Sequence, residues 1–496
     1  MGGTKSLFKD TAIYGVSSIV GRFLNWCLVP LYTIMFPAAE YGVVTYIYSI
    51  VALALIILTY GMETGFFRFA NHDRYTDATE VYSTSLISLA STSVAFLVLL
   101  IVFISPISEA IECSGHEDYV IMMGIAVAVD AFTSIPFAYL RFRHRPMRFA
   151  TLRLISIALN IGLNLWFILI CPWLVRQMPS LSWIYDPAYG IGYIFLANLI
   201  SSGVVLLLMI PELRGFRWRF NASLWREMLR YSYPLLVLGI AGIMNQTIDK
   251  ILYPSLAPDE ATAMQELGIY GANYKIAIVM VMFIQAFRFA YEPYIFARDK
   301  ESGRSGTSAY SEAMKYFVIF ALCIFLGVMF YIDIIKYFIS PKYFSGLKVV
   351  PVVMLGEFFF GVFFNLSVWY KLTDKTLWGM WFSLLGLAVT LALNVLLVPR
   401  FGYMGCAWAA FCCYGAMMVT SYFIGQRRYP IKYHAGRLTL IFAFAMAIYG
   451  LSLLIETQVA WVNMLIRTPL LAVFVAVVMK MEHISLRSLI PSRRHA

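Results

Sequence analysis

Charged and polar side chains interrupt apolar stretches that are otherwise suited to burial in lipid. Arg22 lies about midway along the apolar run 10–35, and Gly15, Ser18, Arg22 and Asn25 recur at spacings of three and four. In a helix these four residues form one polar stripe. A charged group at membrane depth is costly unless it faces an aqueous cavity or a partner. The stripe therefore predicts a cavity wall that contacts a polar cargo.

Similar polar positions recur along the chain. Gly242, Asn245, Asp249 and Tyr253 repeat the stripe in a later apolar run, and Lys250 adjoins it. We predict that the residues lining a substrate cavity are Arg22, Asn25, Glu63, Arg68, Asn245, Lys250, Lys275 and Arg288. Because the cations outnumber the carboxylates, the cavity suits an anionic cargo, and nearby Gly, Ser, Asn and aromatic residues suit sugar hydroxyls and ring faces.

Two carboxylates are candidates for coupling transport to a proton or sodium gradient. Asp249 and Glu292 each lie beside a basic residue whose charge they could compensate. The same proximity allows a purely structural interpretation, in which Asp249 neutralises Lys250 or Lys275 and Glu292 pairs with Arg288.

Other ionisable residues also keep two interpretations. Glu63 and Arg68 lie near the end of their run and could extend toward the membrane interface. Asp130 and Glu357 are further cavity candidates, and we assign Arg467 to packing or lipid contact.

The composition excludes most other classes of protein. The chain of 496 residues is 61% hydrophobic and 13% charged, far from the balance of a soluble domain. The loops are too short for a soluble catalytic domain, and the sequence has neither metal-ligand spacing nor a glycine-rich phosphate loop. We therefore expect no enzymatic activity and no cofactor. The net charge of +11 suits anionic lipid headgroups, and nucleic-acid binding is not expected.

The elements that position these residues are transmembrane helices, because only helices and closed barrels satisfy their backbone groups in lipid. The apolar runs are too long for barrel strands. An all-α membrane protein of about fourteen spans is predicted, with each span near the roughly 20 residues that a crossing needs. The predicted spans are 10–35, 41–67, 81–104, 119–140, 149–171, 188–210, 231–253, 269–296, 316–332, 349–370, 377–398, 403–425, 438–455 and 459–479.

The distribution of Lys and Arg predicts the orientation. With the N-terminus in the cytoplasm, most of the 38 Lys and Arg residues fall on the cytoplasmic side, as in the loop from Arg141 to Arg148. The loops of the opposite side carry only Arg176, Lys336, Lys342, Lys348 and Arg400. By the positive-inside rule both termini are cytoplasmic.

An internal repeat predicts two lobes. The segments that begin at Glu40 and Glu266 both read Glu-x-Gly-[Val/Ile]-x-x-x-x-Tyr-x-Ile, at the start of the second and the eighth span. Leu-Asn pairs at 163–164 and 393–394, and aromatic-Gly pairs at 189–190 and 401–402, repeat the correspondence. A repeat of six spans keeps its orientation, which places a site between two halves. The predicted parts are an N-lobe, a C-lobe and a final pair of spans with a tail, at 1–222, 223–430 and 431–496.

Taken together, these features resemble a known family. Fourteen spans in a six-plus-six-plus-two order look like the multidrug/oligosaccharidyl-lipid/polysaccharide exporter superfamily. Within it, several stretches resemble the bacterial polysaccharide or O-antigen flippase branch (Wzx-type), namely 20–23, 60–69, 249–250, 268–276, 287–293 and 394–405.

The resemblance implies a flippase for undecaprenyl-diphosphate-linked oligosaccharide, working by alternating access in the bacterial inner membrane. Besides the bilayer and this polyprenyl-diphosphate-linked glycan, the implied partners are the polysaccharide polymerase and the glycosyltransferases of the same pathway. A cation-coupled multidrug exporter and a peptidoglycan-precursor flippase of the same superfamily remain alternatives. A glycan polymerase or ligase would need a large periplasmic loop, which this sequence does not have.

Overall fold

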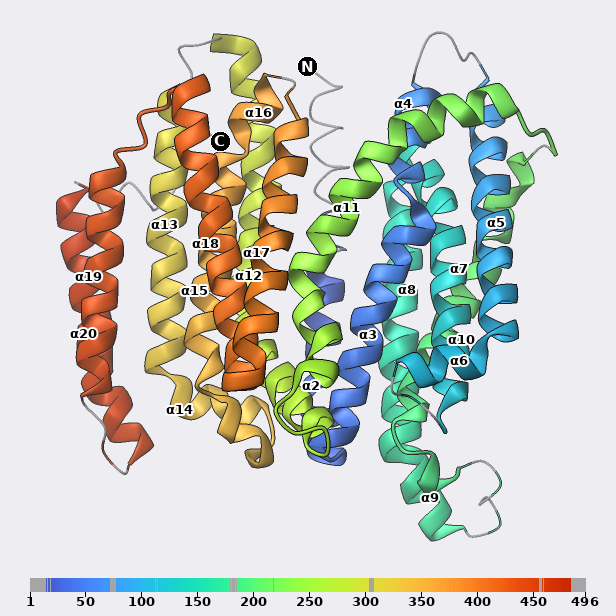
Figure 1. The fold of residues 1–496 in the computed structure, drawn as a ribbon, viewed down its shortest axis with the longest axis horizontal. Coiled ribbons are helices and arrows are strands. Elements are labelled where there is room, and N and C mark those ends of the chain that lie inside the picture. The colour runs from blue at the N-terminus through green and yellow to red at the C-terminus, as the bar shows by residue number, and fades with distance from the viewer. Residues whose placement is uncertain are drawn as a thin grey trace, which may run out of the picture. The chain divides into compact units, whose positions relative to one another are not determined.

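The computed structural model describes residues 15, 17, 19–71, 77–111, 113, 115–178, 180, 183, 185–216, 218–302, 307–373, 375–454, 457 and 459–482. The side chains at 215, 290, 292–302, 307 and 460 fall outside this description. Within the described ranges every regular element is a helix, as Figure 1 shows.

The helices confirm the all-α prediction of about fourteen spans. Among the described residues, 12 helices are long and apolar enough to cross a membrane. They are Ala38–Ala70, Ala78–Val102, Glu117–Phe142, Pro146–Gln177, Ala222–Leu256, Ala263–Phe289, Ser308–Phe330, Val349–Leu372, Leu377–Phe401, Tyr403–Arg428, Ala435–Leu453 and Trp461–Met481. Two shorter apolar helices, Ile19–Met35 and Gly192–Leu208, coincide with the first and sixth predicted spans. The chain is therefore a multi-pass membrane protein.

Several spans consist of more than one helical segment. The labelled helices are α2 (Val29–Met35), α3 (Ala38–Thr59), α4 (Met62–Ala70), α5 (Ala78–Val102), α6 (Ile104–Ala110), α7 (Glu117–Phe142), α8 (Pro146–Leu165), α9 (Cys171–Gln177), α10 (Gly192–Leu208), α11 (Ala222–Leu256), α12 (Ala263–Ser302), α13 (Thr307–Phe330), α14 (Ile332–Ile335), α15 (Val349–Leu366), α16 (Val368–Leu372), α17 (Leu377–Phe401), α18 (Tyr403–Arg428), α19 (Ala435–Leu453) and α20 (Ala460–Met481). Short 3₁₀ segments are Pro187–Tyr189, Ile210–Gly215, Lys336–Phe338 and Pro341–Gly346.

Two of the breaks within spans have local causes. Tyr60 and Gly61 both adopt left-handed backbone conformations, with φ of 32° and 71°, and they end α3 and begin α4. A side chain at position 61 would also approach the carbonyl oxygen of Ser232 to 3.2 Å, so glycine is required there twice over. Between α8 and α9, the π-helix Trp166–Ile170 precedes Pro172. Proline lacks the N–H that an α-helix needs and clashes with the carbonyl four residues earlier.

The described contacts group the chain into two compact units. Unit 1 comprises Met1–Ala272 and Thr376–Cys413, and unit 2 comprises Asn273–Lys375 and Tyr414–Ala496. The division passes through α12 and through α18. The lobes predicted at 1–222 and 223–430, with 431–496 apart, follow the repeat rather than the contacts and stay a prediction.

Within unit 1 the two repeated segments pack directly against each other. A Cβ atom on Gly42 of α3 would lie 1.9 Å from the carbonyl oxygen of Met264, and one on Gly268 of α12 would lie 1.8 Å from the carbonyl oxygen of Ala38. The two helices therefore cross backbone against backbone, which only glycine allows. The Glu-x-Gly repeat is a packing motif as well as a sign of duplication.

The glutamates of the same repeat lie against the repeated aromatic-Gly pairs. A Cβ on Gly190 would meet Glu40 Oε2 at 3.2 Å, and a Cβ on Gly402 would meet Glu266 Oε2 at 3.3 Å. Both glycines have positive φ, of 49° and 55°. Each half of the repeat thus holds a carboxylate against a left-handed glycine turn. The sequence showed that both segments recur in each half, but it did not show that they lie against each other.

Unit 2 is built around α13 and α15. Rings of Phe317, Phe325 and Phe330 on α13 are fully buried, and α13 contacts α15, α19 and α20. Figure 1 shows α19 and α20 side by side. Arg467 of α20 is 7% exposed and donates to Asp333 Oδ2 of α14 over 3.3 Å. This ion pair confirms that Arg467 has a packing role.

Candidate functional site

Arg22 and Asn25 are exposed, although they belong to the apolar helix Ile19–Met35. The neighbouring Gly21 is buried, and a Cβ there would approach Ile157 Cδ1 of α8 to 2.6 Å. The first span therefore packs on α8 beside Arg22. Because an arginine in hydrocarbon is costly, we expect this side chain to face a polar surrounding rather than lipid tails, and its place in a cavity stays a prediction.

Arg153 is a cavity candidate that the sequence analysis missed. It lies four residues before Ile157, so it shares the face of α8 that receives the first span. Arg153 is exposed, and its guanidinium lies 4.1 Å from the ring centroid of Phe137. It also interacts electrostatically with Asp130, an exposed carboxylate of α7. Arg153 was missed because it lies near the start of a predicted span, where an arginine at the membrane interface is ordinary. Its spacing of four residues from Ile157, which packs against the first span, could have identified it.

Asp249 and Lys250 form a buried polar network in unit 1. Their side chains are 7% and 10% exposed, and Lys250 Nζ donates to Asp249 Oδ1 over 3.1 Å and to the Gln246 carbonyl oxygen over 2.9 Å. The Tyr270 hydroxyl donates to Asp249 Oδ2 over 2.6 Å. Of the two partners predicted for Asp249, Lys250 is the one that contacts it. The carboxylate is placed to neutralise a buried ammonium group, which is costly to leave alone.

The rest of the predicted stripe on α11 is also packed. Asn245 is buried and donates to the Ser383 carbonyl oxygen of α17 over 3.1 Å. Tyr253 is fully buried, and its hydroxyl donates to Glu266 Oε2. In this structure the stripe thus joins α11 to α12 and α17. A role of Asn245 and Lys250 in the cavity stays a prediction.

The two charged residues predicted in α4 have separate partners. Glu63 forms a salt bridge with Arg141 of α7, and the two side chains are 41% and 31% exposed. Arg68 is exposed, and its guanidinium lies 4.1 Å from the ring centroid of Tyr231 of α11. The structure therefore brings Glu63 to an arginine that the sequence analysis placed in a loop.

In unit 2, two cations lie against one phenylalanine ring. Arg288 of α12 is exposed, and its guanidinium is 4.6 Å from the ring centroid of Phe364. Lys371 Nζ, at the end of α16, is 4.3 Å from the same centroid. The Phe364 ring thus holds two cation–π contacts, one from each helix. Lys371 was missed because its position in the sequence resembles an ordinary interfacial lysine.

Lys275 lies half-buried on α12. The hydroxyl of its neighbour Tyr274 donates to Glu357 Oε1 of α15 over 2.7 Å, and Glu357 is 4% exposed. The side chain of Glu292 lies outside the described residues, so its role and its predicted pairing with Arg288 stay predictions. Among the described residues, no three His, Cys, Asp or Glu side chains are grouped to hold a metal ion.

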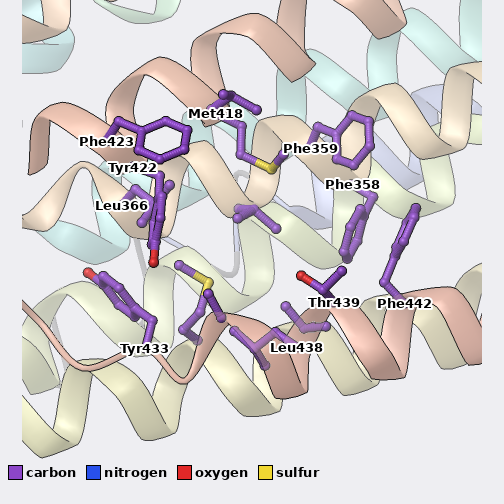
Figure 2. Close-up of a pocket in the computed structure, with 15 residues that line it drawn as sticks. Phe358, Phe359, Leu366, Met418, Tyr422, Phe423, Tyr433, Leu438, Thr439 and Phe442 are labelled. Atoms are coloured by element: carbon purple, nitrogen blue, oxygen red, sulfur yellow. The ribbon is translucent and has the colours of Figure 1, made fainter. Parts of the chain in front are cut away.

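Unit 2 also contains an apolar pocket of about 360 Å³ (Figure 2). Tyr433, Leu438, Thr439 and Phe442 lie along one side, and Phe358, Leu366 and Tyr422 lie across from them. A polar cleft of about 570 Å³ shares Tyr433 and Leu438 with this pocket.

Comparison with known proteins agrees with this architecture. A family model described as "Polysaccharide biosynthesis protein" matches residues 7–298, which is more than half of the chain. Comparison with curated protein sequences yields no significant match.

Solved structures share the fold. The lipid II flippase MurJ in an inward closed conformation aligns over 96% of this chain and 99% of its own, with a TM-score of 0.70 and 14% identity. An inward-facing multidrug resistance MATE transporter aligns over 84% and 94%, with a TM-score of 0.64 and 14% identity. An outward-facing MATE transporter aligns over 85% of this chain and 95% of its own, with a TM-score of 0.58 and 12% identity. The chain therefore belongs to the family described as polysaccharide biosynthesis protein.

Proposed function

We propose that the protein is a flippase for undecaprenyl-diphosphate-linked oligosaccharide, the repeat unit of O-antigen, capsule or another surface polysaccharide. It would move the glycan from the cytoplasmic to the periplasmic leaflet of the bacterial inner membrane by alternating access, with both termini in the cytoplasm. The observation that carries the proposal is the exposure of Arg22, Arg153 and Arg288 within spanning helices of a protein of this family.

Each of these cations, taken within its own unit, suits a diphosphate group. In a cavity of low dielectric, a fixed positive charge attracts an anion far more strongly than it does in water. An arginine fork also binds two phosphate oxygens at once, which fixes the orientation of the head group. Asn25 is exposed three residues after Arg22 and can donate to and accept from sugar hydroxyls. The site binds and releases its cargo, and the proposal includes no bond-making chemistry and no cofactor.

The membrane potential can supply part of the driving force. Moving a negative charge out of a negative-inside cell is favoured by about 2.3 kcal/mol per charge per 100 mV. We propose Asp249 first and Glu292 second as carboxylates that would couple transport to a proton or sodium gradient. Asp249 has the partners for such a role, because Lys250 and Tyr270 would both lose a charged acceptor on its protonation.

A peptidoglycan-precursor flippase is the second candidate. The fold likeness to the lipid II flippase MurJ extends over nearly the whole chain. Such a cargo is also a lipid-linked diphosphate, so the same cations would serve it. A cation-coupled drug exporter fits less well, because a cationic drug would be repelled by exposed Arg22, Arg153 and Arg288.

Depletion of the protein followed by lipid analysis tests the assignment. The expected result is accumulation of one polyprenyl-diphosphate-linked glycan that resists a glycosidase in sealed spheroplasts and becomes sensitive after lysis. The glycosyltransferases and the polymerase of the pathway are the expected functional partners, acting before and after this step. Accumulation of the peptidoglycan precursor instead would favour the second candidate, and no accumulated lipid-linked glycan would reject both.

A further inference from the structure

Two hollows of opposite polarity adjoin in unit 2. The apolar pocket of Figure 2, of about 360 Å³, is lined by residues of α13, α15, α18 and α19. The polar cleft, of about 570 Å³, is lined by residues near the starts of α13 and α19, by residues of the segment 430–434 and by Glu482. Because Tyr433 and Leu438 line both, the hollows form one composite site with an apolar and a polar end. Such a site matches an amphiphile, which has an apolar chain and a polar head group.

The polar cleft carries an excess of positive charge. Lys315 Nζ and Glu482 Oε2 lie 3.3 Å apart, and the Glu482 side chain is 6% exposed, so this ion pair is part of the wall. Among the described residues, the other charged side chains that line the cleft are the exposed Lys432, Arg437 and Glu312. The two exposed cations outnumber the exposed carboxylate, and an anion entering the cleft would meet a net positive field.

The segment that carries Lys432 is held in place on both sides. The Ser311 hydroxyl donates to the Lys432 carbonyl oxygen over 2.6 Å, and Gln426 Nε2 donates to the Ile431 carbonyl oxygen over 2.7 Å. His434 has a left-handed backbone, with φ of 49°, at the start of α19. Non-glycine residues persist in this conformation where the surrounding structure holds them. The backbone that carries Lys432 therefore has a defined conformation at the edge of the polar cleft.

The apolar end opens where a lipid chain could enter. Val419 and Phe423 of α18 line the pocket and are 47% and 62% exposed, so its wall continues onto the lipid-facing side of the helix. Burial raises the pKa of Tyr433 well above its ordinary value. Its hydroxyl therefore stays protonated at the junction of the two hollows and can donate a hydrogen bond there.

We propose that this composite site binds an anionic phospholipid, with the phosphate between Lys432 and Arg437 and one acyl chain in the apolar pocket. Basic pockets between helices at the cytoplasmic side are suited to anionic lipid head groups. The Lys and Arg distribution predicts these helix ends on that side, where phospholipid is the abundant amphiphile. A lipid seated here would join α19 to α13, α15 and α18. The site does not depend on the proposed flippase activity.

The test measures lipid binding to the purified full-length protein by native mass spectrometry. The probes are dioleoylphosphatidylglycerol, dioleoylphosphatidylcholine and a polyprenyl monophosphate. We expect phosphatidylglycerol to bind in preference to the other two. The variant Lys432→Gln/Arg437→Gln should bind it roughly thirtyfold more weakly. Each basic residue near an anionic lipid surface contributes a similar share of the binding free energy, and this variant removes two of them. The matched control Arg226→Gln/Arg230→Gln removes two exposed arginines elsewhere and should bind normally.

A second variant tests the apolar end. Thr439 lines the pocket and is exposed, so Thr439→Phe fills the pocket without changing charge and should also weaken binding. If that variant does not fold, the charge variant at the exposed rim still decides the question. Unchanged affinity in Lys432→Gln/Arg437→Gln, equal binding of phosphatidylcholine, or binding of the polyprenyl phosphate alone would each overturn the proposal. Because no glycan cargo is used, failure here leaves the flippase proposal standing.

Discussion

Arginines at membrane depth have two distinct environments in this chain. Arg467 is buried and bonded to Asp333, so its charge is compensated by a neighbouring helix of the same unit. Arg22 and Arg153 are exposed, and Arg153 shares the face of α8 that packs against the helix of Arg22. The first environment joins α20 to α14, whereas Arg153 interacts electrostatically with Asp130 and lies over the Phe137 ring. We propose that Arg22 and Arg153 contact the cargo.

The first prediction concerns Arg22. Arg22→Ala should lower surface-polysaccharide export at least about tenfold while the protein still accumulates, because a charge acting in a low-dielectric cavity is lost. Arg22→Lys should keep part of the activity, since charge survives without the bidentate fork. Export is measured per amount of membrane protein, with Arg226→Ala, at an exposed position predicted to face the cytoplasm, as the control. Normal export by Arg22→Ala would rule out a direct contact with the cargo.

The second prediction concerns the Asp249–Lys250 pair. Asp249→Asn should destabilise the protein by about 3–5 kcal/mol, because it leaves a buried ammonium without its carboxylate. The double variant Asp249→Asn/Lys250→Met should recover most of that stability, which thermal unfolding in detergent measures. If Asp249 also couples transport to an ion gradient, the stable double variant will transport in vesicles without a response to proton or sodium gradients. A double variant that responds as wild type does would limit Asp249 to a structural role.

At the scale of elements, the crossing of α3 and α12 is the tightest helix contact that the repeat produces. Gly42 and Gly268 each occupy a position where a Cβ would lie within 2 Å of a carbonyl oxygen of the other helix. Such a contact holds two helices at backbone distance and depends on two residues alone. It also explains why the Glu-x-Gly sequence recurs at the same register in both segments.

The third prediction uses this crossing. Gly268→Ala should lower the free energy of unfolding by about 1–3 kcal/mol, because the helices must separate to accept a methyl group. The control is Gly327→Ala in α13, where a Cβ meets no atom within 4 Å. That change should be neutral or slightly stabilising, since alanine favours helix over glycine by about 1 kcal/mol. Equal melting temperatures for the two variants would contradict the close crossing.

At the scale of the whole molecule, orientation follows from where the basic residues lie along fourteen spans. The described helices confirm the positions of these spans, and the predicted topology then assigns alternate loops to the two sides of the membrane. Loop 141–145 is basic and loop 257–262 is acidic, and the two are separated by an odd number of spans. They should therefore lie on opposite sides.

The fourth prediction tests this topology. In a variant in which all seven cysteines are replaced by serine, Glu260→Cys should react with a membrane-impermeant maleimide in intact spheroplasts. Arg143→Cys should react only after permeabilisation. Both positions are exposed, so accessibility to the reagent is matched apart from the side of the membrane. Labelling of Arg143→Cys in intact cells would show that the orientation is inverted.

The sequence by itself determined the class of the protein, its spans and the family it resembles. Partition into lipid depends on the length and hydropathy of each run, which are local properties, so the helix limits agree with the predicted spans to within a few residues at most ends. The repeat was also readable, because duplicated segments keep their residue types in register. Arg22, Asn25 and Arg288 were predicted from the same local signal, as polar residues in apolar runs, and their role in a cavity stays a prediction.

Only the tertiary structure decided which charges meet and which stay exposed. Asp249 bonds Lys250 and Tyr270, Glu63 bonds Arg141, and Arg153 and Lys371 join the candidate residues although their positions looked ordinary. A side chain's partner depends on which helices cross and at what height. That is set by packing between segments distant in sequence, such as Gly42 against Gly268, which no local pattern encodes.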